Sequence, residues 1–378
     1  MSPLVPAPSA THQVRLHLKV LHPPPADMPP EAMATYMRDV YAPYGIDVVV
    51  ASPVEDLSHL ELLKDLWTDG CMLRSPTPDQ DTLFGYRDGA GADDLCIYFV
   101  RSTVDDAAAG CASLAPADGF PNGRPAAVVT HDATPWTLGH ECGHLLGLTH
   151  VLPVVQVMVS GTWQITVDPP MLEPAEVETI KNSPFAHRIA AAGPPPGPAA
   201  PAAPTPASDQ SGADATCRET HGGGRLADTI RRDLDRDDGL DYDGLARRFG
   251  PWAVEALSTV VCADRPRIAA GAIALAARME GGAGFPVVAQ GSASVHTVVR
   301  VAAAASARRL PDEPATPIVA RLLGDRDVGV RGHAVRSAVR IGAPVLLEQV
   351  RAIAERDPSR ALRELADELL EPRRASAS

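Results

Sequence analysis

The sequence predicts an α+β domain with a mixed, twisted sheet, followed by an all-α domain built from repeated helices. Three observations support this division. Strand-like and helix-like patterns alternate over residues 1–187, residues 188–215 are rich in Pro, Ala and Ser and nearly uncharged, and residues 216–378 show helical patterns without a strand signal. The middle segment has no apolar face to bury, so we interpret it as a linker between two domains.

Apolar periodicity places the elements of the first domain. Residues 14–21 alternate with a period of two, as expected of a strand, and residues 30–41 have the pattern of a helix that begins at a Pro pair. Short apolar runs predict three further strands at 46–50, 95–100 and 126–130. Because strands and helices interleave, a mostly parallel sheet is favoured.

The second domain has the pattern of four helix pairs. The first helices are expected to begin near Pro251, Phe285, Thr316 and Pro344, and the second helices near Pro266, Ser294, Asp327 and Pro358. A helical hairpin that recurs about every 30 residues indicates a stacked α-solenoid. Residues 327–339 resemble the second helix of a HEAT repeat, and the resemblance covers about 250–370. An irregular Ala-rich helical bundle is the alternative.

The formal net charge of −13 is distributed unevenly along the chain. Residues 1–187 carry 9 Lys and Arg against 23 Asp and Glu, whereas residues 188–378 carry 25 against 24. An acidic first domain argues against a nucleic-acid partner, because proteins that bind the phosphate backbone need a basic face. It favours basic or neutral polypeptides as substrates instead.

Neither a membrane span nor an export signal is visible. No stretch approaches the ~18 consecutive apolar residues of a spanning helix, and residues 1–20 lack the basic start and apolar run of a signal peptide. The six cysteines show no paired spacing. We therefore expect a cytoplasmic protein with free thiols and no membrane partner.

The strongest chemical signal lies between Thr134 and His150, in the segment TPWTLGHECGHLLGLTH. Thr134 suits an N-cap and Pro135 the first helical position, so a helix is expected to begin here. An apolar stripe of this helix should pack on the sheet; it consists of Leu138, Cys142, Leu145 and Leu146. His140 and His144 lie one turn apart on another face, so both imidazoles can reach one metal ion.

Gly147 is expected to end the helix in a left-handed conformation, which brings His150 back toward the same ion. Three neutral imidazoles leave the fourth tetrahedral position open to water, as in a catalytic zinc site. Glu141 follows the first ligand and can accept a proton from that water. Cys142 points into the core in this interpretation and is not a ligand. The alternative is an inactive scaffold that keeps a satisfied cluster of histidines.

The pattern H-E-x-x-H-x-x-G-x-x-H over residues 140–150 resembles the metzincin clan of zinc metallopeptidases. The resemblance covers about residues 12–187. It implies a methionine turn beneath the metal, to which Met158 corresponds, and a closing helix, to which residues 172–181 correspond. The chain departs from serralysins and astacins at Ser160, where those families place a tyrosine, so no tyrosine ligand is expected.

The resemblance also implies a strand at the border of the cleft, along which substrate binds as an added antiparallel strand. The candidate for this strand is the segment GCASL, which comprises Gly110, Cys111, Ala112, Ser113 and Leu114. An ordinary loop is the alternative interpretation of these residues.

A second candidate metal site looks like a calcium loop of the EF-hand type. Positions 1, 3, 5 and 9 of such a loop correspond to Asp233, Asp235, Asp237 and Asp241. However, Asp238 stands where the loop needs Gly, and Gly244 stands where it needs a bidentate Glu. An acidic, solvated loop between helices is therefore favoured over a Ca²⁺ site.

Together these observations predict a cytoplasmic, bacterial metallopeptidase that binds one Zn²⁺ per chain and hydrolyses peptide bonds of a protein substrate. The helical repeats would recognise the substrate or a protein activator, or inhibit the catalytic domain. The alternative is a catalytically degenerate scaffold that acts through its repeats, and a zinc hydrolase of non-peptide amides would use the same ligands. Because the linker cannot pack, we expect few contacts between the domains.

Overall fold

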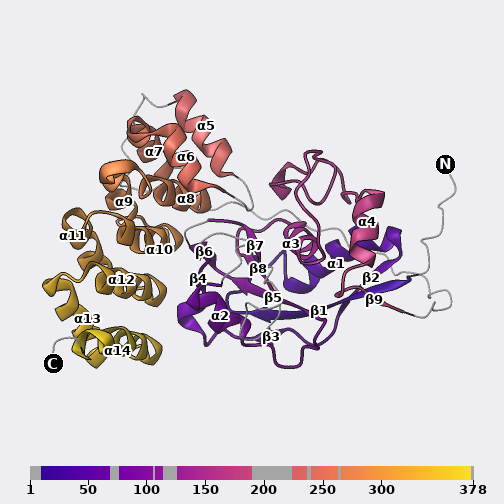
Figure 1. Cartoon of the computed structure of the whole chain (residues 1–378), viewed down its shortest axis with the longest axis horizontal. Coiled ribbons are helices and arrows are strands. Elements are labelled where there is room, and N and C mark those ends of the chain that lie inside the picture. The colour runs from indigo at the N-terminus through magenta and orange to yellow at the C-terminus, as the bar shows by residue number, and fades with distance from the viewer. Residues whose placement is uncertain are drawn as a thin grey trace.

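The computed structural model describes residues 10–68, 76–104, 107–113, 126–189, 224–235, 240–262 and 265–375. The first half folds around a mixed sheet and the second half consists of helices, as the sequence predicts. In Figure 1 the sheet and its helices run from indigo to magenta, and the later helices form an orange-to-yellow column beside them.

The main sheet has the strand order β2-β1-β5-β8-β7. These strands are β1 (His12–Val20), β2 (Ile46–Val50), β5 (Leu95–Val100), β7 (Gly110–Ser113) and β8 (Ala126–Thr130). The first four in spatial order are parallel, and β7 runs antiparallel to β8 at the edge. The short strands β3 (Glu55–Asp56) and β9 (His187–Arg188) also pair with β1. A separate two-stranded sheet, β4 (Asp65–Trp67) with β6 (Ser102–Val104), was not expected from the sequence.

Helices cover both faces of the main sheet. On one face α1 (Pro30–Tyr41) and α3 (Thr137–Leu145) enclose an apolar cluster with the alternate residues Leu95, Ile97 and Phe99 of β5. On the other face Phe84 of α2 (Pro78–Phe84) joins a second cluster with the intervening β5 residues Cys96, Tyr98 and Val100. This alternation is the two-residue period of a strand that is buried on both faces.

Two predicted boundaries in the first half are wrong. Helix α3 begins at Thr137 rather than at Pro135, and its N-cap is Trp136 rather than Thr134 and makes no side-chain capping bond. The predicted linker begins too early, because Arg188 lies in β9 and pairs with His12. The remaining linker residues, from 190 to 215, lie outside the described residues.

The expectation of free thiols is wrong for two cysteines. Cys111 and Cys262 each take part in a disulfide bond, whereas Cys96 and Cys142 are free and buried. The other two, Cys71 and Cys217, lie outside the described residues. Disulfide partners can lie far apart in the sequence, so irregular cysteine spacing does not indicate free thiols. The cysteines therefore give no support for a reducing compartment. Among the described helices, none is long and apolar enough to cross a bilayer.

The second half begins with α5 (Gly224–Leu234) and α6 (Tyr242–Phe249) and continues as helical hairpins. The hairpins are α7 (Val254–Val261) with α8 (Pro266–Ala276), α9 (Phe285–Gly291) with α10 (Thr297–Ser306), α11 (Asp312–Leu322) with α12 (Val328–Ile341), and α13 (Pro344–Arg356) with α14 (Arg360–Ala375). The second helices α8, α10, α12 and α14 stack on one another in chain order (Figure 1). We call α5–α14 the helical array.

The array packs against the first half, so the expectation of few contacts is wrong. The guanidinium of Arg101 donates to Asp327 at the start of α12 (2.8 Å). Further along α12, Arg336 donates to Asp79 (2.8 Å), and a ring nitrogen of His333 lies 3.0 Å from the carbonyl oxygen of Asp65. The face formed by the second helices is therefore largely occupied by the protein's own first half.

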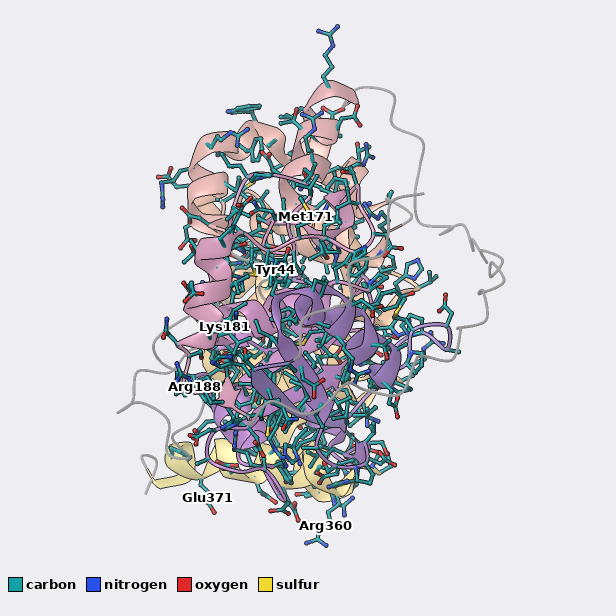
Figure 2. The ribbon with its side chains drawn as sticks, turned by 90° about the vertical axis from the view of Figure 1, so that its right-hand side faces the viewer. Tyr44, Met171, Lys181, Arg188, Arg360 and Glu371 are labelled. Atoms are coloured by element: carbon teal, nitrogen blue, oxygen red, sulfur yellow. The ribbon has the colours of Figure 1, made fainter. Side chains whose placement is uncertain are left out.

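Figure 2 views the molecule from the side opposite the array. Lys181 in α4 (Pro174–Lys181) and Arg188 in β9 lie on the face of the first half that is turned away from the array. Arg360 and Glu371, which belong to α14, lie at the lower end of the array.

Candidate metal centre

Helix α3 is fixed to the sheet by the predicted apolar stripe. Leu138, Cys142, Leu145 and Leu146 are all buried in the cluster between the helix and the sheet. On the side facing α1, the hydroxyl of Tyr41 donates to the carbonyl of Gly139 (3.0 Å). Burial raises the pKa of the Cys142 thiol, whose side chain packs in the apolar cluster against the sheet.

The end of α3 turns the chain back toward the helix. Gly147 has a φ of +101°, and its N–H donates to the carbonyl of His144 (3.0 Å). The next N–H, of Leu148, donates to the carbonyl of Gly143 (2.9 Å). These two bonds form a Schellman motif, in which glycine is favoured because a Cβ would strain the left-handed residue. The predicted reversal is confirmed, and it brings His150 to the face that carries the other two histidines.

Three imidazoles converge at this reversal. The Nε2 atom of His144 lies 3.2 Å from Nε2 of His140 and 3.1 Å from Nε2 of His150. A metal bound to nitrogen at 2.0–2.1 Å in tetrahedral geometry requires nitrogen atoms roughly 3.3 Å apart. His140, His144 and His150 therefore form a group that could hold a metal ion.

The opposite ring nitrogens orient the two buried rings. Nδ1 of His140 lies 2.8 Å from the carbonyl oxygen of Val157, and Nδ1 of His144 lies 3.0 Å from that of Leu148. A carbonyl only accepts, so each Nδ1 carries the proton and each Nε2 presents a lone pair to the centre. His140 and His144 are buried, whereas His150 is exposed, so the group faces solvent on the His150 side.

Glu141 is fully buried, next to His140 on α3. Its carboxylate lies against the first residue of β7. A Cβ added to Gly110 would come within less than 3.0 Å of Oε1, Cγ and Cδ of Glu141, closer than real Cβ atoms approach. A side chain at position 110 would therefore force the Glu141 side chain to move.

Met158 is fully buried in the cluster under α3. Its carbonyl accepts from the N–H of Val151 (3.0 Å), so the segment after His150 pairs with the segment that contains this methionine. Helix α4 follows within the expected range of 172–181, and the hydroxyl of Tyr44 accepts from the N–H of Leu172 just before it (3.1 Å). Tyr44 and Met171, the residue before Leu172, are labelled in Figure 2.

The predicted edge strand is a strand as far as it is described. Gly110–Ser113 forms β7, and Leu114 lies outside the described residues. In the described part of the sheet, β7 has β8 as its one neighbour. Gly110 faces α3, and Cys111 belongs to the apolar cluster on the opposite face.

Sequence reasoning missed the groups that orient the site. The acceptors at Val157 and Leu148 are backbone carbonyls, which leave no mark in the choice of side chain. A hydroxyl cluster at the start of α3 was also missed. The hydroxyl oxygen of Thr162 lies 2.5 Å from that of Thr134 and 3.2 Å from that of Thr137.

The described carboxylates of the candidate calcium loop have other partners. Asp233 pairs with Arg248 (2.9 Å), and Asp235 pairs with Arg265 (2.6 Å) and Arg267 (2.7 Å). Asp241 accepts from the N–H of Gly244 (2.8 Å) as the N-cap of α6. Asp237 lies outside the described residues. Guanidinium groups compete with a cation for these oxygens, so the described residues offer no support for Ca²⁺.

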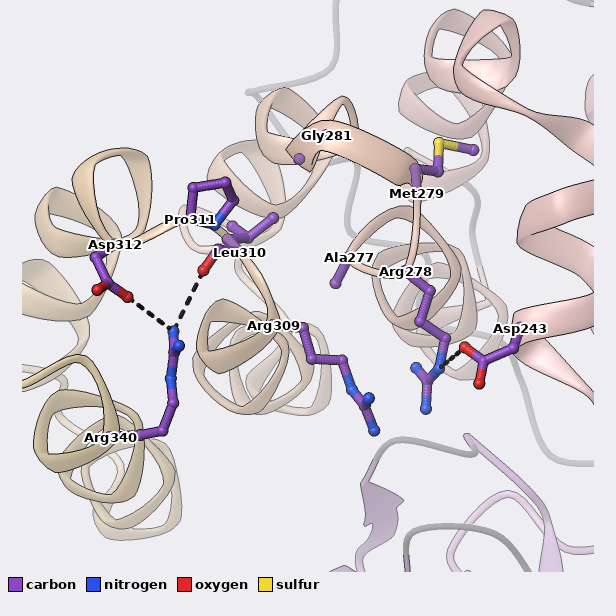
Figure 3. Close-up of a pocket in the computed structure, with 11 residues that line it drawn as sticks. Asp243, Ala277, Arg278, Met279, Gly281, Arg309, Leu310, Pro311, Asp312 and Arg340 are labelled. Carbon is purple, nitrogen blue, oxygen red and sulfur yellow. Dashed lines mark hydrogen bonds and ion pairs between the residues drawn. The ribbon is translucent and has the colours of Figure 1, made fainter.

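A polar cavity of about 630 Å³ lies on the array, away from the histidines (Figure 3). Arg278, Arg309 and Arg340 line it, each 31 residues after the one before, in register with the helical hairpins. Arg278 pairs with Asp243 (3.5 Å) and Arg340 with Asp312 (3.3 Å), as the dashed lines in Figure 3 indicate. These residues come from the ends of stacked helices, so the cavity is a feature of the array and not of the candidate metal centre.

No protein-family model matches the chain, and no curated protein matches its sequence. Among solved structures, a similar one is metalloproteinase-II from Bacteroides fragilis, with 17% identity and a TM-score of 0.31. The similarity covers 47% of this chain and 54% of that one, so the chain spans about half the length of that structure.

Proposed function

We propose that this chain is a zinc-dependent endopeptidase whose metal ligands are Nε2 of His140, His144 and His150. The observation that carries the proposal is the convergence of these three atoms at separations of 3.1 and 3.2 Å, with the two buried rings oriented through Nδ1. Bonding from Nδ1 to a carbonyl fixes the ring tautomer and raises the basicity of the ligating nitrogen. Zinc favours such a set of imidazoles over the oxygen ligands that Mg²⁺ and Ca²⁺ require.

Bound zinc would polarise the scissile carbonyl and lower the pKa of a water molecule toward ~7. Glu141 is the general base in this mechanism: its carboxylate accepts a proton from the attacking water and then passes it to the leaving amine. The buried position of Glu141 against Gly110 holds the carboxylate in place. The position of Met158 under α3 suits the packing role of a methionine turn.

Strand β7 is the proposed template for the substrate. An extended peptide that pairs antiparallel with an edge strand is held by backbone hydrogen bonds, largely independent of its sequence. Pairing next to Gly110 would bring a peptide bond close to Glu141, because the strand begins against that carboxylate. This arrangement favours cleavage within a chain.

Recognition by the helical array is restricted by its packing. The face formed by the second helices already contacts the first half through Arg101, His333 and Arg336. A substrate or activator protein would therefore bind the outer helices α7, α9, α11 and α13. Disulfides at Cys111 and Cys262 are typical of proteins in oxidising compartments, and we propose such a compartment in place of the cytoplasm.

The test combines metal analysis with one variant. The purified chain should contain one zinc and cleave unstructured peptides, and Glu141→Gln should keep the zinc while losing activity by roughly 10²–10⁴-fold. A chain without stoichiometric zinc would support the degenerate scaffold instead. Cleavage of non-peptide amides but not of peptides would identify the amide hydrolase. Proteome-wide mapping of new N-termini, active chain against Glu141→Gln, would then identify the substrate.

A further inference from the structure

A buried ion pair of the array reaches the segments that border α3. Asp235, at the end of α5, binds Arg267 in the first turn of α8 (2.7 Å), and both residues are less than a tenth exposed. Each partner also contacts the first half. Arg267 donates to the carbonyl of Ala107 (3.3 Å), and the indole N–H of Trp163 donates to the carbonyl of Asp235 (2.5 Å).

The contact at Ala107 lies three residues before Gly110. Ala107 has a φ of +47°, which non-glycine residues rarely adopt, and it packs in the apolar cluster of the array. Ala108 and Ala109, the two residues between Ala107 and Gly110, are each hydrogen-bonded within the first half. The N–H of Ala108 donates to the hydroxyl of Thr103 (2.8 Å), and the carbonyl of Ala109 accepts from the hydroxyl of Thr130 (2.9 Å). Only two residues separate Ala107 from Gly110, so the release of Ala107 from Arg267 would loosen the start of β7, against which the Glu141 carboxylate lies.

The contact at Trp163 leads to the other side of α3. Trp163 lies in the short helix η3 (Thr162–Gln164), and the hydroxyl of Thr162 is bonded to the start of α3. Six residues before Trp163, the carbonyl of Val157 accepts from His140. The same ion pair thus contacts the segment that leads to the proposed base and the segment that orients a proposed ligand.

We infer that the Asp235–Arg267 pair is a positioning element of the candidate catalytic centre, through which the array holds both segments in register with α3. The inference rests on the proposed function. Arg101, His333 and Arg336 already attach the array elsewhere, so attachment alone does not require this pair. A buried pair whose backbone and side-chain groups bind both segments limits their relative movement, and small displacements of reacting groups reduce rates strongly.

The experiment uses the full chain and two variants, Arg267→Ala and Trp163→Phe. Arg331→Ala is the matched control, because Arg331 forms a similarly buried pair with Asp357 (2.9 Å) and also donates to the carbonyls of Asp325 and Arg326, so these bonds stay within the array. Hydrogen exchange of the metal-free protein and peptide kinetics of the zinc-loaded protein are measured for each. In both variants we expect faster hydrogen exchange at residues 107–113 and 157–164. We also expect kcat to fall by roughly tenfold or more while KM stays nearly constant. Arg267→Lys should recover part of the rate.

Equal exchange at these segments in Arg267→Ala and Arg331→Ala, with equal kcat, would overturn the inference. Trp163→Phe keeps the test decisive if Arg267→Ala does not fold, because it removes the indole donor and retains an aromatic ring. If the wild-type chain cleaves no peptide, the proposed function fails, and the exchange data alone decide whether the ion pair restrains the two segments.

Discussion

The sulfur of Met158 lies against the backbone of Gly143, the residue before the second candidate ligand. A Cβ on Gly143 would come within less than 3.0 Å of this sulfur and 3.2 Å from the terminal methyl carbon. The thioether thus fills the space directly under the helix between His140 and His144. This contact fixes the distance between α3 and the segment that carries Met158. Because α3 carries His140 and His144, the same distance determines where their imidazoles converge.

Gly143→Ala should therefore destabilise the protein by about 1–3 kcal/mol, as expected for an overpacked core, and weaken zinc binding. Thermal unfolding and competition with a zinc chelator measure the two effects. Gly139→Ala is the control in the same helix, because its Cβ would meet Met37 at 3.6 Å, an ordinary contact. Alanine also favours a helix over glycine, so the control should be neutral or stabilising. Equal effects of the two substitutions would contradict the close approach of Met158.

Met158→Leu should retain zinc and cost less than about 1.5 kcal/mol, because the side chain packs without coordinating and the exchange nearly conserves volume. Denaturant unfolding and metal analysis of the dialysed protein check both statements. Loss of the metal from this variant would show that the sulfur does more than pack.

His150→Ala should reduce zinc affinity by more than roughly 10–100-fold. That is the cost of losing a residue that only hydrogen-bonds a ligand, and His150 is proposed to be a ligand itself. His150 is the exposed member of the group, so its removal leaves two imidazoles at a solvent-accessible centre. Titration with a zinc chelator at neutral pH measures the change, and the unfolding temperature without metal should differ little. Retention of one tightly bound zinc would place the third ligand elsewhere.

His333 should make the contact between the array and the first half sensitive to acid. Burial and, to a lesser extent, the neighbouring Arg336 lower the pKa of His333 below its usual value near 6.5, against the opposing effect of Asp79 and Asp65. The unfolded chain therefore binds more protons than the folded chain below about pH 6.5. The contribution of neutral His333 to the free energy of unfolding is complete above that pH and is lost as pH falls.

His333→Gln keeps a donor for the carbonyl of Asp65 but does not titrate. It should lose less stability than the wild-type chain between pH 7 and pH 5, as measured by denaturant unfolding. Other buried histidines, such as His12, change equally in both proteins and cancel in the comparison. Parallel pH profiles would show that His333 is not responsible.

Elements with a strong local pattern could be predicted from the sequence. The bounds of α1, β2, β5 and β8 match the predicted ranges to the residue, because apolar periodicity and flanking Pro or Gly act within a few positions. The start of α3 was placed two residues too early, at Pro135 instead of Thr137. Thr134 has the residue type of an N-cap, and its hydroxyl oxygen accepts from the N–H of Trp136 (3.3 Å), but the same hydroxyl also bonds Thr162, a partner 28 residues away. Competition from a distant partner is invisible to a local rule.

For the site, local patterns identify the residues that could act: the spacing of His140, His144 and His150 around Gly147, and the carboxylate at Glu141. These follow from helix geometry and a glycine reversal, which are local. The groups that hold them depend on the three-dimensional fold, namely the carbonyl of Val157 on His140, the close approach of Gly110 to Glu141, and the packing of the array against the first half. The fold also decided that Cys111 and Cys262 are oxidised. Such contacts join segments far apart in the chain and often involve backbone atoms, so no pattern of neighbouring side chains encodes them.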